Sequence, residues 1–212
     1  RNILSCVKGK VCYTMGNYAM VDNVYNVMIL QKALKDRTLV FNEDVDTQSI
    51  YKLAYYMDKI KKIDDMNNTP KKDRKIIIEI SSGGGSCVSG FFICGKIEKF
   101  QKDYGYTIIT RINEIGASMA FLMFIMGDIR EMYKYSEVMF HQPLSAYFDY
   151  EKMQDTEDRL KNITVSWNRF KKICSERTKM TDEQMELCKR EKRDWWMDAE
   201  EALALNVATK II

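Results

Sequence analysis

Histidine is almost absent from this sequence of 212 residues, which contains a single one, His141. The six cysteines are spread along the chain, and none of them forms a Cys-x-x-Cys pair. A structural zinc site is usually built from four clustered cysteine and histidine side chains, so the sequence does not favour one. Scattered cysteines are typical of free thiols in a reducing compartment, and we expect neither a metal nor another cofactor.

Long apolar runs and an excess of charge of one sign are also missing. No stretch approaches the roughly 20 apolar residues that a membrane-spanning helix needs, and no secretory signal sequence is visible. The 33 basic residues are scattered among 30 acidic ones, which leaves a formal charge of +3 and no basic stripe for nucleic acid. We therefore expect a cytoplasmic globular protein that binds neither membrane nor nucleic acid.

Apolar runs and helical patterns alternate from about residue 37 onward. Residues 38–41, 75–80, 107–112 and 137–140 are typical of buried strands. Helical patterns lie between them, at residues 50–60, 91–100 and 116–126. This order of strands and helices predicts βαβ units in a layered α/β domain with a largely parallel sheet.

A long helix is predicted at about residues 150–178, after the sheet is complete. Its apolar stripe needs a cover, so either the domain folds back on it or a second subunit packs against it. The stripe consists of Met153, Leu160, Ile163, Trp167, Phe170 and Cys174. We divide the chain into an N-terminal segment at residues 1–36, where residues 24–34 are compatible with a helix, and one domain at residues 37–212.

Ser118 and His141 are the first candidates for chemistry. Ser118 follows a predicted strand and precedes an apolar helix, where free backbone N–H groups can stabilise an oxyanion. A helix N-cap is the competing interpretation of this serine. His141 follows another predicted strand, and a neutral imidazole is the usual base for activating a serine hydroxyl. The competing interpretation is a lone histidine packed against the core.

Two further features are weaker signals. The glycine-rich turn at residues 81–86 follows a strand and can bring backbone N–H groups close to a ligand, although a plain turn explains it as well. It matches neither a Walker A loop nor a GxGxxG motif. Glu191, Asp194 and Asp198 form an acidic group near the C-terminus that can supply a carboxylate to orient a histidine. Solvated or capping roles are the alternative for these three residues.

Three motifs in this order resemble the ClpP family of proteolytic subunits. Residues 80–86, Ile-Ser-Ser-Gly-Gly-Gly-Ser, resemble the family's Ile-Asn-Ser-Pro-Gly-Gly-Ser turn, with Gly83 in place of the proline. Residues 116–120, Gly-Ala-Ser-Met-Ala, resemble its nucleophile motif, and residues 138–143, Val-Met-Phe-His-Gln-Pro, its histidine motif. Residues 198–202, Asp-Ala-Glu-Glu-Ala, resemble its closing segment, so the likeness runs from about residue 24 to residue 212.

The resemblance implies a fold and a set of site residues. The fold is the ClpP/crotonase-like layered βαβ spiral with a protruding "handle" helix. Ser118 is the implied nucleophile and His141 the general base of a serine-type endopeptidase, and the N–H groups of Gly85 and Met119 form the oxyanion hole. The substrate adds as a strand along a surface made by Gly84, Ser86, Cys87, Val88, Pro143, Leu144 and Ser145.

The third member of the triad departs from the family pattern. Aligned from the C-terminus, Arg190 stands where the family has its aspartate, and the region carries about two extra residues. Asp194 is the nearest aspartate and is our predicted orienting carboxylate. Glu191, or no carboxylate at all, remains the alternative, and a missing carboxylate lowers activity by several orders of magnitude in serine proteases.

The resemblance also implies an assembly. Family members form two stacked seven-membered rings whose handle helices interlock, so we expect a homo-oligomeric tetradecamer. An AAA+ unfoldase feeds polypeptides into the internal chamber and uses the ATP of this ATP-dependent proteolysis, so the chain itself needs no cofactor. The sequence does not identify the unfoldase, the ring size or the cleavage preference.

Three other functions compete with an active protease. A catalytically silent ring subunit is favoured by the altered aspartate region and opposed by the presence of both Ser118 and His141. A crotonase-like acyl-CoA enzyme shares the fold and a two-amide oxyanion hole but uses Glu or Asp as its acid and base. A signal-peptide peptidase uses a serine–lysine dyad and a membrane anchor, neither of which the sequence indicates.

Overall fold

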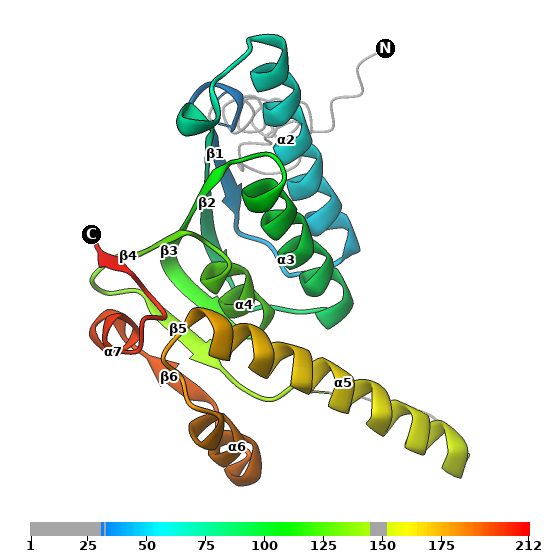
Figure 1. The fold of residues 1–212 in the computed structure, drawn as a ribbon. Coiled ribbons are helices and arrows are strands. Elements are labelled where there is room, and N and C mark those ends of the chain that lie inside the picture. The colour runs from blue at the N-terminus through cyan, green and yellow to red at the C-terminus, as the bar shows by residue number, and fades with distance from the viewer. Residues whose placement is uncertain (1–30, 32, 145–151) are drawn as a thin grey trace, which may run out of the picture.

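The computed structural model describes residues 31, 33–144 and 152–212, and Figure 1 shows a twisted sheet with helices on one side. The first half of the chain forms β1 (Thr38–Phe41), α2 (Thr47–Met66), β2 (Lys75–Ser82), α3 (Cys87–Lys102) and β3 (Thr107–Ala117). The second half forms α4 (Met119–Ile125), β4 (Ile129–Met132), β5 (Glu137–Phe140), α5 (Met153–Arg177), α6 (Asp182–Glu191), β6 (Trp195–Met197), α7 (Ala199–Ala204) and β7 (Lys210–Ile211). The predicted α/β class is confirmed.

The sheet branches at β3. Strands β1, β2, β3, β4 and β7 pair in that order and all run parallel. The first half of β3 pairs with β4, while its last residues pair in parallel with β5, where Ala117 lies opposite Met139. Strand β6 then adds to β5 in the antiparallel direction. The carboxyl ends of β3 and β5 therefore lie side by side, with the start of β6 next to them.

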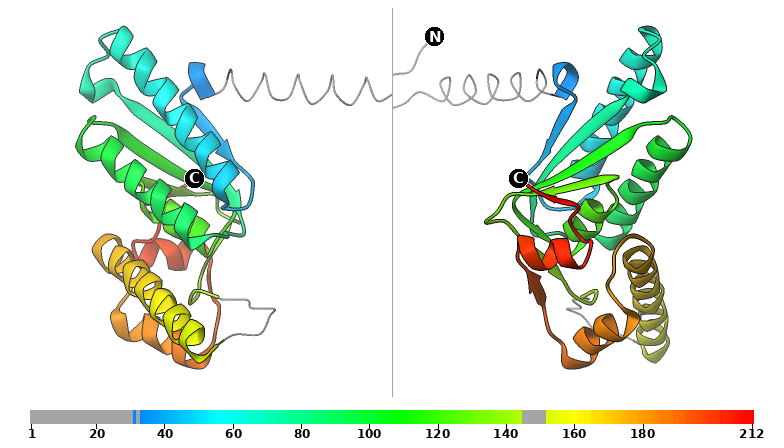
Figure 2. Two further views of the ribbon diagram at one scale, coloured as in Figure 1. Left: turned by 90° about the vertical axis from the view of Figure 1, so that its right-hand side faces the viewer. Right: turned by 60° about the vertical axis from the view of Figure 1, so that its left-hand side comes forward.

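One face of the sheet is buried under α2, α3 and α4. Figure 2 shows α2 and α3 lying side by side over this face. The strand side chains that point toward the helices are fully buried, as is every residue of α4. Each such apolar side chain contributes about 1.5–3 kcal/mol through burial. On the strands these side chains include Leu39, Phe41, Ile76, Ile78, Ile80, Ile108 and Ile112.

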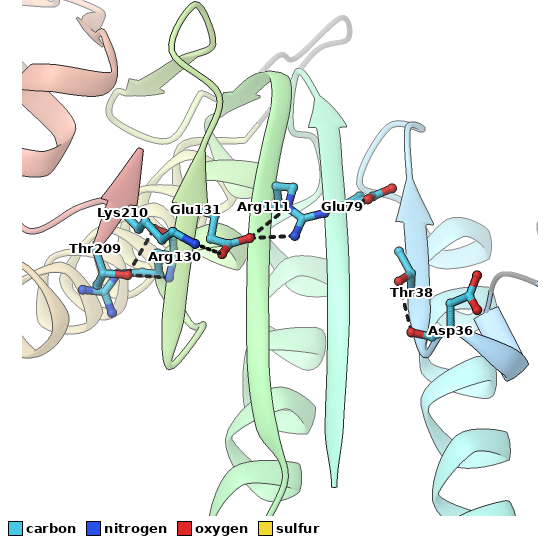
Figure 3. Close-up of polar contacts among 8 residues, drawn as sticks. All are labelled: Asp36, Thr38, Glu79, Arg111, Arg130, Glu131, Thr209 and Lys210. Carbon is cyan, nitrogen blue, oxygen red and sulfur yellow. Dashed lines mark hydrogen bonds and ion pairs between the residues drawn. The ribbon is translucent and has the colours of Figure 1, made fainter. Parts of the chain in front are cut away.

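The opposite face of the sheet carries a row of charges. Glu79, Arg111, Glu131 and Lys210 lie next to one another on β2, β3, β4 and β7 and alternate in sign (Figure 3). Arg111 contacts Glu131 at 2.7 Å and Glu79 at 3.1 Å, and Lys210 contacts Glu131 at 3.3 Å. Each charge therefore has a partner of opposite sign on the neighbouring strand.

Helix α5 projects beyond the rest of the domain (Figure 1). It covers Met153–Arg177, within the predicted span of about 150–178, of which residues 150 and 151 lie outside the described residues. Trp167 and Phe170 are buried against the domain, whereas Met153 is 80% exposed and Leu160 is 65% exposed. The domain thus covers only the C-terminal half of the predicted apolar stripe.

Several boundaries differ from the sequence predictions. Residues 116 and 117 belong to β3 and not to a helix, because they pair with Val138 and Met139 on β5. Helix α3 begins at Cys87, after the N-cap Ser86, and not at residue 91. Strands β4 and β7 are not predicted from the sequence. The acidic group near the C-terminus is expected in a helix-to-strand connection, which α6 and β6 form, but the sequence predicts no bounds for these two elements. Most of residues 1–36 lies outside the described residues, including the greater part of the helix predicted at residues 24–34. Residues 31, 33 and 34, at the end of that predicted helix, are described and are helical.

Candidate active site

Ser118 lies in a strained turn between β3 and α4. Its φ of 55° and ψ of −119° fall outside the regions that L-residues prefer, at a cost of about 1–3 kcal/mol. The backbone N–H of Ser118 donates to Met139 O at 2.9 Å, which ties the turn to the end of β5. Ser118 occupies the N-cap position of α4, yet its side chain makes no capping hydrogen bond. The hydroxyl is therefore free to serve another partner.

That partner is His141. Nε2 of His141 lies 2.8 Å from Oγ of Ser118, within hydrogen-bonding distance. The two residues meet because each directly follows one of two paired parallel strands, β3 and β5. The imidazole is only 13% exposed. His141 thus contacts the serine and is not merely a histidine packed into the core.

The register of β6 brings Asp194 to the histidine. Val138, Met139 and Phe140 lie opposite Met197, Trp196 and Trp195. Continuing this antiparallel register by one residue places Asp194 opposite His141.

The side chains meet as the register indicates, although loosely. Oδ1 of Asp194 lies 3.4 Å from Nδ1 of His141, longer than a typical N–H···O hydrogen bond. The carboxylate is also 56% exposed. The structure brings together the three residues predicted as a triad, with the third contact the weakest.

The other two acidic candidates serve elsewhere. Oε2 of Glu191 lies 3.6 Å from Nη1 of Arg193, at the end of α6. Asp198 is the N-cap of α7 and accepts a hydrogen bond from the N–H of Glu201 at 2.8 Å. Their contacts match the solvated and capping roles that the sequence left open for them.

The glycine-rich turn packs directly against Ser118. A side chain on Gly84, whose φ is 98°, would bring its Cβ within 2.7 Å of Cβ of Ser118. Gly84 O accepts from the N–H of Val45 at 2.8 Å, and the N–H of Ser86 donates to Val45 O at 2.6 Å. In a parallel bridge of this kind, the N–H of the middle residue, Gly85, points away from the paired strand. The turn is therefore more than a plain connection.

A groove of about 520 Å³ begins at this turn. One side is formed by the start of α3 and the segment after His141, and the other by the N-terminal half of α5. Burial raises the pKa of the Cys87 thiol, which lines the groove. The lining includes Gly85 and five of the predicted substrate-binding residues: Ser86, Cys87, Val88, Pro143 and Leu144. Gly84 lies beside Ser118 and does not line the groove, and Ser145 is outside the described residues.

The described residues contain neither a metal site nor a membrane-spanning helix. No group of three or more histidine, cysteine, aspartate or glutamate side chains within them could hold a metal ion. None of the described helices is long and apolar enough to cross a bilayer.

Sequence reasoning missed the elements that support Asp194. Strand β6 has only three residues, Trp195–Met197, and α6 is a short polar helix. The one available signal was the Thr-x-x-Gln sequence that begins at Thr181, which forms a capping box at the start of α6. Nothing in the sequence alone indicated that β6 pairs with β5.

Comparison with known proteins gives one consistent result. The model of the family described as Clp protease matches residues 21–212. A relative in Bacillus licheniformis, named ATP-dependent Clp protease proteolytic subunit 2, is 26% identical over 190 residues, which cover 87% of this chain and 90% of the relative. A relative in Porphyromonas gingivalis, named ATP-dependent Clp protease proteolytic subunit, is 27% identical over 195 residues, which cover 90% of this chain and 80% of the relative.

Proposed function

Because the chain belongs to the Clp protease family, we propose that it is an active serine endopeptidase with Ser118 as nucleophile and His141 as general base. The observation that carries the proposal is the 2.8 Å contact between Oγ of Ser118 and Nε2 of His141. The strained backbone at Ser118 supports it, since such strain collects at functional sites. The Ser118 side chain, moreover, makes no capping bond to α4 that would explain it otherwise.

The reaction follows from this geometry. Oγ of Ser118 attacks the scissile carbonyl carbon while Nε2 of His141 takes the hydroxyl proton. The tetrahedral intermediate collapses, and His141 returns the proton to the leaving amine, which leaves an acyl-enzyme. A water molecule, deprotonated by His141, then attacks the acyl carbon. The bond between the acyl carbon and Oγ breaks, His141 returns the proton to Oγ, and the second product leaves as a carboxylic acid.

The oxyanion is held by the backbone N–H groups of Gly85 and Met119. Met119 is the first residue of α4, whose N–H has no partner within the helix. Gly85 reaches the same place because Gly84 packs against Ser118 with no room for a side chain. Two donors aimed at a developing negative charge are the usual form of an oxyanion hole, and losing one typically costs about 10²–10³ in kcat.

Asp194 orients the imidazole. A carboxylate facing Nδ1 selects the tautomer in which Nε2 is free to accept the serine proton. The 3.4 Å separation from Nδ1 leaves this contact incomplete in the isolated chain. Catalytic hydrogen bonds are often long without substrate and shorten in the productive complex, and we expect the same here.

The substrate lies in the groove as an added strand. Gly84, Ser86, Cys87, Val88, Pro143, Leu144 and Ser145 make up the proposed substrate-binding surface. Binding through main-chain hydrogen bonds demands little of the substrate sequence, which suits an enzyme that degrades unfolded polypeptides.

The proposed context is an assembled cytoplasmic chamber. The N-terminal half of α5 leaves Met153, Leu160 and Val165 exposed, and contact between stacked rings would bury them. We propose self-association into such rings, with polypeptides delivered by an AAA+ unfoldase. The chain itself then needs no nucleotide and no other cofactor.

A silent ring subunit is the second candidate. The observation that favours it is the exposed and distant carboxylate of Asp194. In that case the chain would assemble with an active paralogue and contribute no hydrolysis of its own.

Labelling with a fluorophosphonate probe distinguishes the two. An active enzyme forms a covalent adduct that is lost in Ser118→Ala and His141→Ala and weakened in Asp194→Ala. Ser81→Ala is the matched control, because Ser81 is a strand residue whose hydroxyl bonds to Glu114, and this variant should label like the unaltered chain. Assembled rings that take up no probe would refute the enzyme and favour the silent subunit.

A further inference from the structure

An aromatic cluster lies directly behind the three site residues. Phe140 is at its centre, with ring centroids 5.9 Å from Phe121, 5.4 Å from Phe170 and 6.4 Å from Trp195. Trp167 lies 5.8 Å from Phe140 by the same measure.

Three of these aromatic residues are close in sequence to the site residues. Phe140 precedes His141, Trp195 follows Asp194, and Phe121 lies in the first turn of α4. The other two, Trp167 and Phe170, come from α5. Helix α5 therefore packs against the segments that carry the reacting groups.

Trp167 also connects α5 to α6. Its indole Nε1 donates a hydrogen bond to Oε1 of Glu186 at 2.9 Å. The same carboxylate contacts Nζ of Lys171, one turn further along α5, at 2.7 Å. Hydrogen bonds from Lys171 and Trp167 lower the pKa of Glu186 to about 2, so its carboxylate is charged at all ordinary pH values.

Helix α6 in turn fixes the segment that leads to Asp194. The helix ends at Glu191, and Lys192 takes a left-handed conformation with φ of 51°. The N–H of Arg193 donates to Cys188 O at 3.0 Å, which completes the C-cap. Asp194 is the next residue, and it lies between this C-cap and Trp195, the first residue of β6.

We infer that Trp167 is a positioning residue for the reaction: through Glu186 it fixes α6, and α6 places the carboxylate of Asp194 beside His141. The inference rests on the proposed protease function. It explains how a carboxylate that is 56% exposed is held near the imidazole, since the support comes from helix packing and not from burial.

The test uses Trp167→Phe in the full-length assembled chain. Phenylalanine keeps an aromatic ring against Phe140 but cannot donate to Glu186. We expect kcat for a small peptide ester to fall roughly tenfold with KM changed less than twofold, because a small displacement of a catalytic group has large kinetic effects. Glu186→Leu should behave alike, whereas Glu186→Gln keeps an acceptor oxygen for the indole and should restore most of the activity.

A double-mutant cycle identifies the route of the effect. In an Asp194→Asn background the carboxylate is already lost, so Trp167→Phe should lower kcat no further. A tenfold loss in both backgrounds would overturn the inference, because Trp167 would then act independently of Asp194. An unchanged kcat in the single variant, with active parent enzyme, would overturn it as well.

A second measurement separates this inference from the proposed function. His141 is the only histidine in the chain, so selective ¹⁵N-histidine labelling gives NMR signals from one imidazole alone. Trp167→Phe should shift the Nδ1 signal in the same direction as Asp194→Asn. A chain that takes up no probe but shows this shift would refute the protease, while Trp167 would still place Asp194 beside His141. An unchanged signal would refute that placement.

Discussion

Asp64 and Asp194 lie at opposite ends of the parallel strands and are held in opposite ways. The side chain of Asp64 is fully buried, where it pairs with both terminal nitrogens of Arg37 and accepts a hydrogen bond from the hydroxyl of Tyr106 at 2.6 Å. Asp194 is 56% exposed and has one long contact, 3.4 Å to Nδ1 of His141. Several partners hold the carboxylate of Asp64 at one end of the sheet, whereas the position of the Asp194 carboxylate depends on its neighbours in the chain.

The difference reflects what each carboxylate must do. A buried charge is tolerated only when its partners replace the lost water, so the contacts of Asp64 are many and close. They join α2 to the residues that precede β1 and β3 and so stabilise the fold. In the proposed reaction, Asp194 faces an imidazole whose charge changes, at a site that substrate must reach. Its place is therefore set by β6 and α6 and not by enclosure.

Removing the buried carboxylate should have the largest effect. Asp64→Ala leaves Arg37 and Tyr106 without their partner, and we expect a loss of about 3–5 kcal/mol from the free energy of unfolding, measured in urea. Asp65→Ala, one residue along, removes only ion pairs of a half-exposed carboxylate and should leave the free energy of unfolding almost unchanged. Equal losses in both variants would contradict the contrast.

Such a loss is a large part of the 5–15 kcal/mol typical of a domain, so Asp64→Ala can fail to fold. Tyr106→Phe is the milder variant, because it removes one hydrogen bond and keeps the ring. It should cost about 1–2 kcal/mol while the labelling rate of Ser118 per folded molecule stays unchanged. A slower labelling rate in this variant would show that the two ends of the sheet are coupled.

Removing the exposed carboxylate of Asp194 should have the opposite outcome, a loss of activity with little change in stability. Asp194→Asn keeps the size of the side chain but no longer selects the imidazole tautomer that accepts the serine proton. Such a change costs about 10⁴ in kcat where the triad is tightly bonded, and we expect about 10² here because the contact with His141 is long. Urea unfolding should change by less than about 0.5 kcal/mol, as for most surface substitutions. A protein that loses stability but not activity would contradict this assignment.

The sequence identifies those site residues that lie next to strands or helices with a clear hydrophobic periodicity. Ser118 and His141 each follow an apolar run, and two such runs in a parallel sheet bring their carboxyl ends together. The contact between these two residues can therefore be predicted from the local sequence pattern and the motifs. The φ of 55° at Ser118 cannot be predicted in this way, because a serine between a strand and a helix is equally compatible with an ordinary N-cap.

The position of the third residue depended on elements with no periodic signal. A strand of three residues, Trp195–Met197, is too short for alternation to identify, and its antiparallel partner lies more than fifty residues earlier in the chain. Asp194 was selected among three acidic residues by its distance in sequence, and only the register with β5 explains why it faces His141. The sequence also does not determine how much of α5 the domain covers, since tertiary contacts alone decide it.

A smaller effect is expected in the pH dependence of the free energy of unfolding, which reports on the buried carboxylate of Asp64. Burial alone would raise the pKa of Asp64, but hydrogen bonds from Arg37 and Tyr106 outweigh it and hold the pKa below its ordinary value. As the pH falls, Asp64 is therefore protonated in the unfolded chain first, near its usual pKa of about 3.9. The stabilisation that Asp64 gives the folded state is full above about pH 5 and is lost as the pH falls through the pKa of the folded state. The stability gap between the parent chain and Asp64→Asn should therefore narrow from pH 5 to pH 3. A constant gap in urea titrations would contradict it.

The smallest effect is expected at Glu191, the other acidic residue proposed from the sequence as the orienting carboxylate. Its side chain pairs with Arg193 at 3.6 Å on the surface, and such pairs contribute about 0–1 kcal/mol. Glu191→Gln should therefore leave both the probe-labelling rate and urea unfolding almost unchanged. If Glu191→Gln instead slowed labelling a hundredfold while Asp194→Asn did not, Glu191 would be the orienting carboxylate. The register between β5 and β6 would then have to shift in the active protein, because in the present register only Asp194 lies opposite His141.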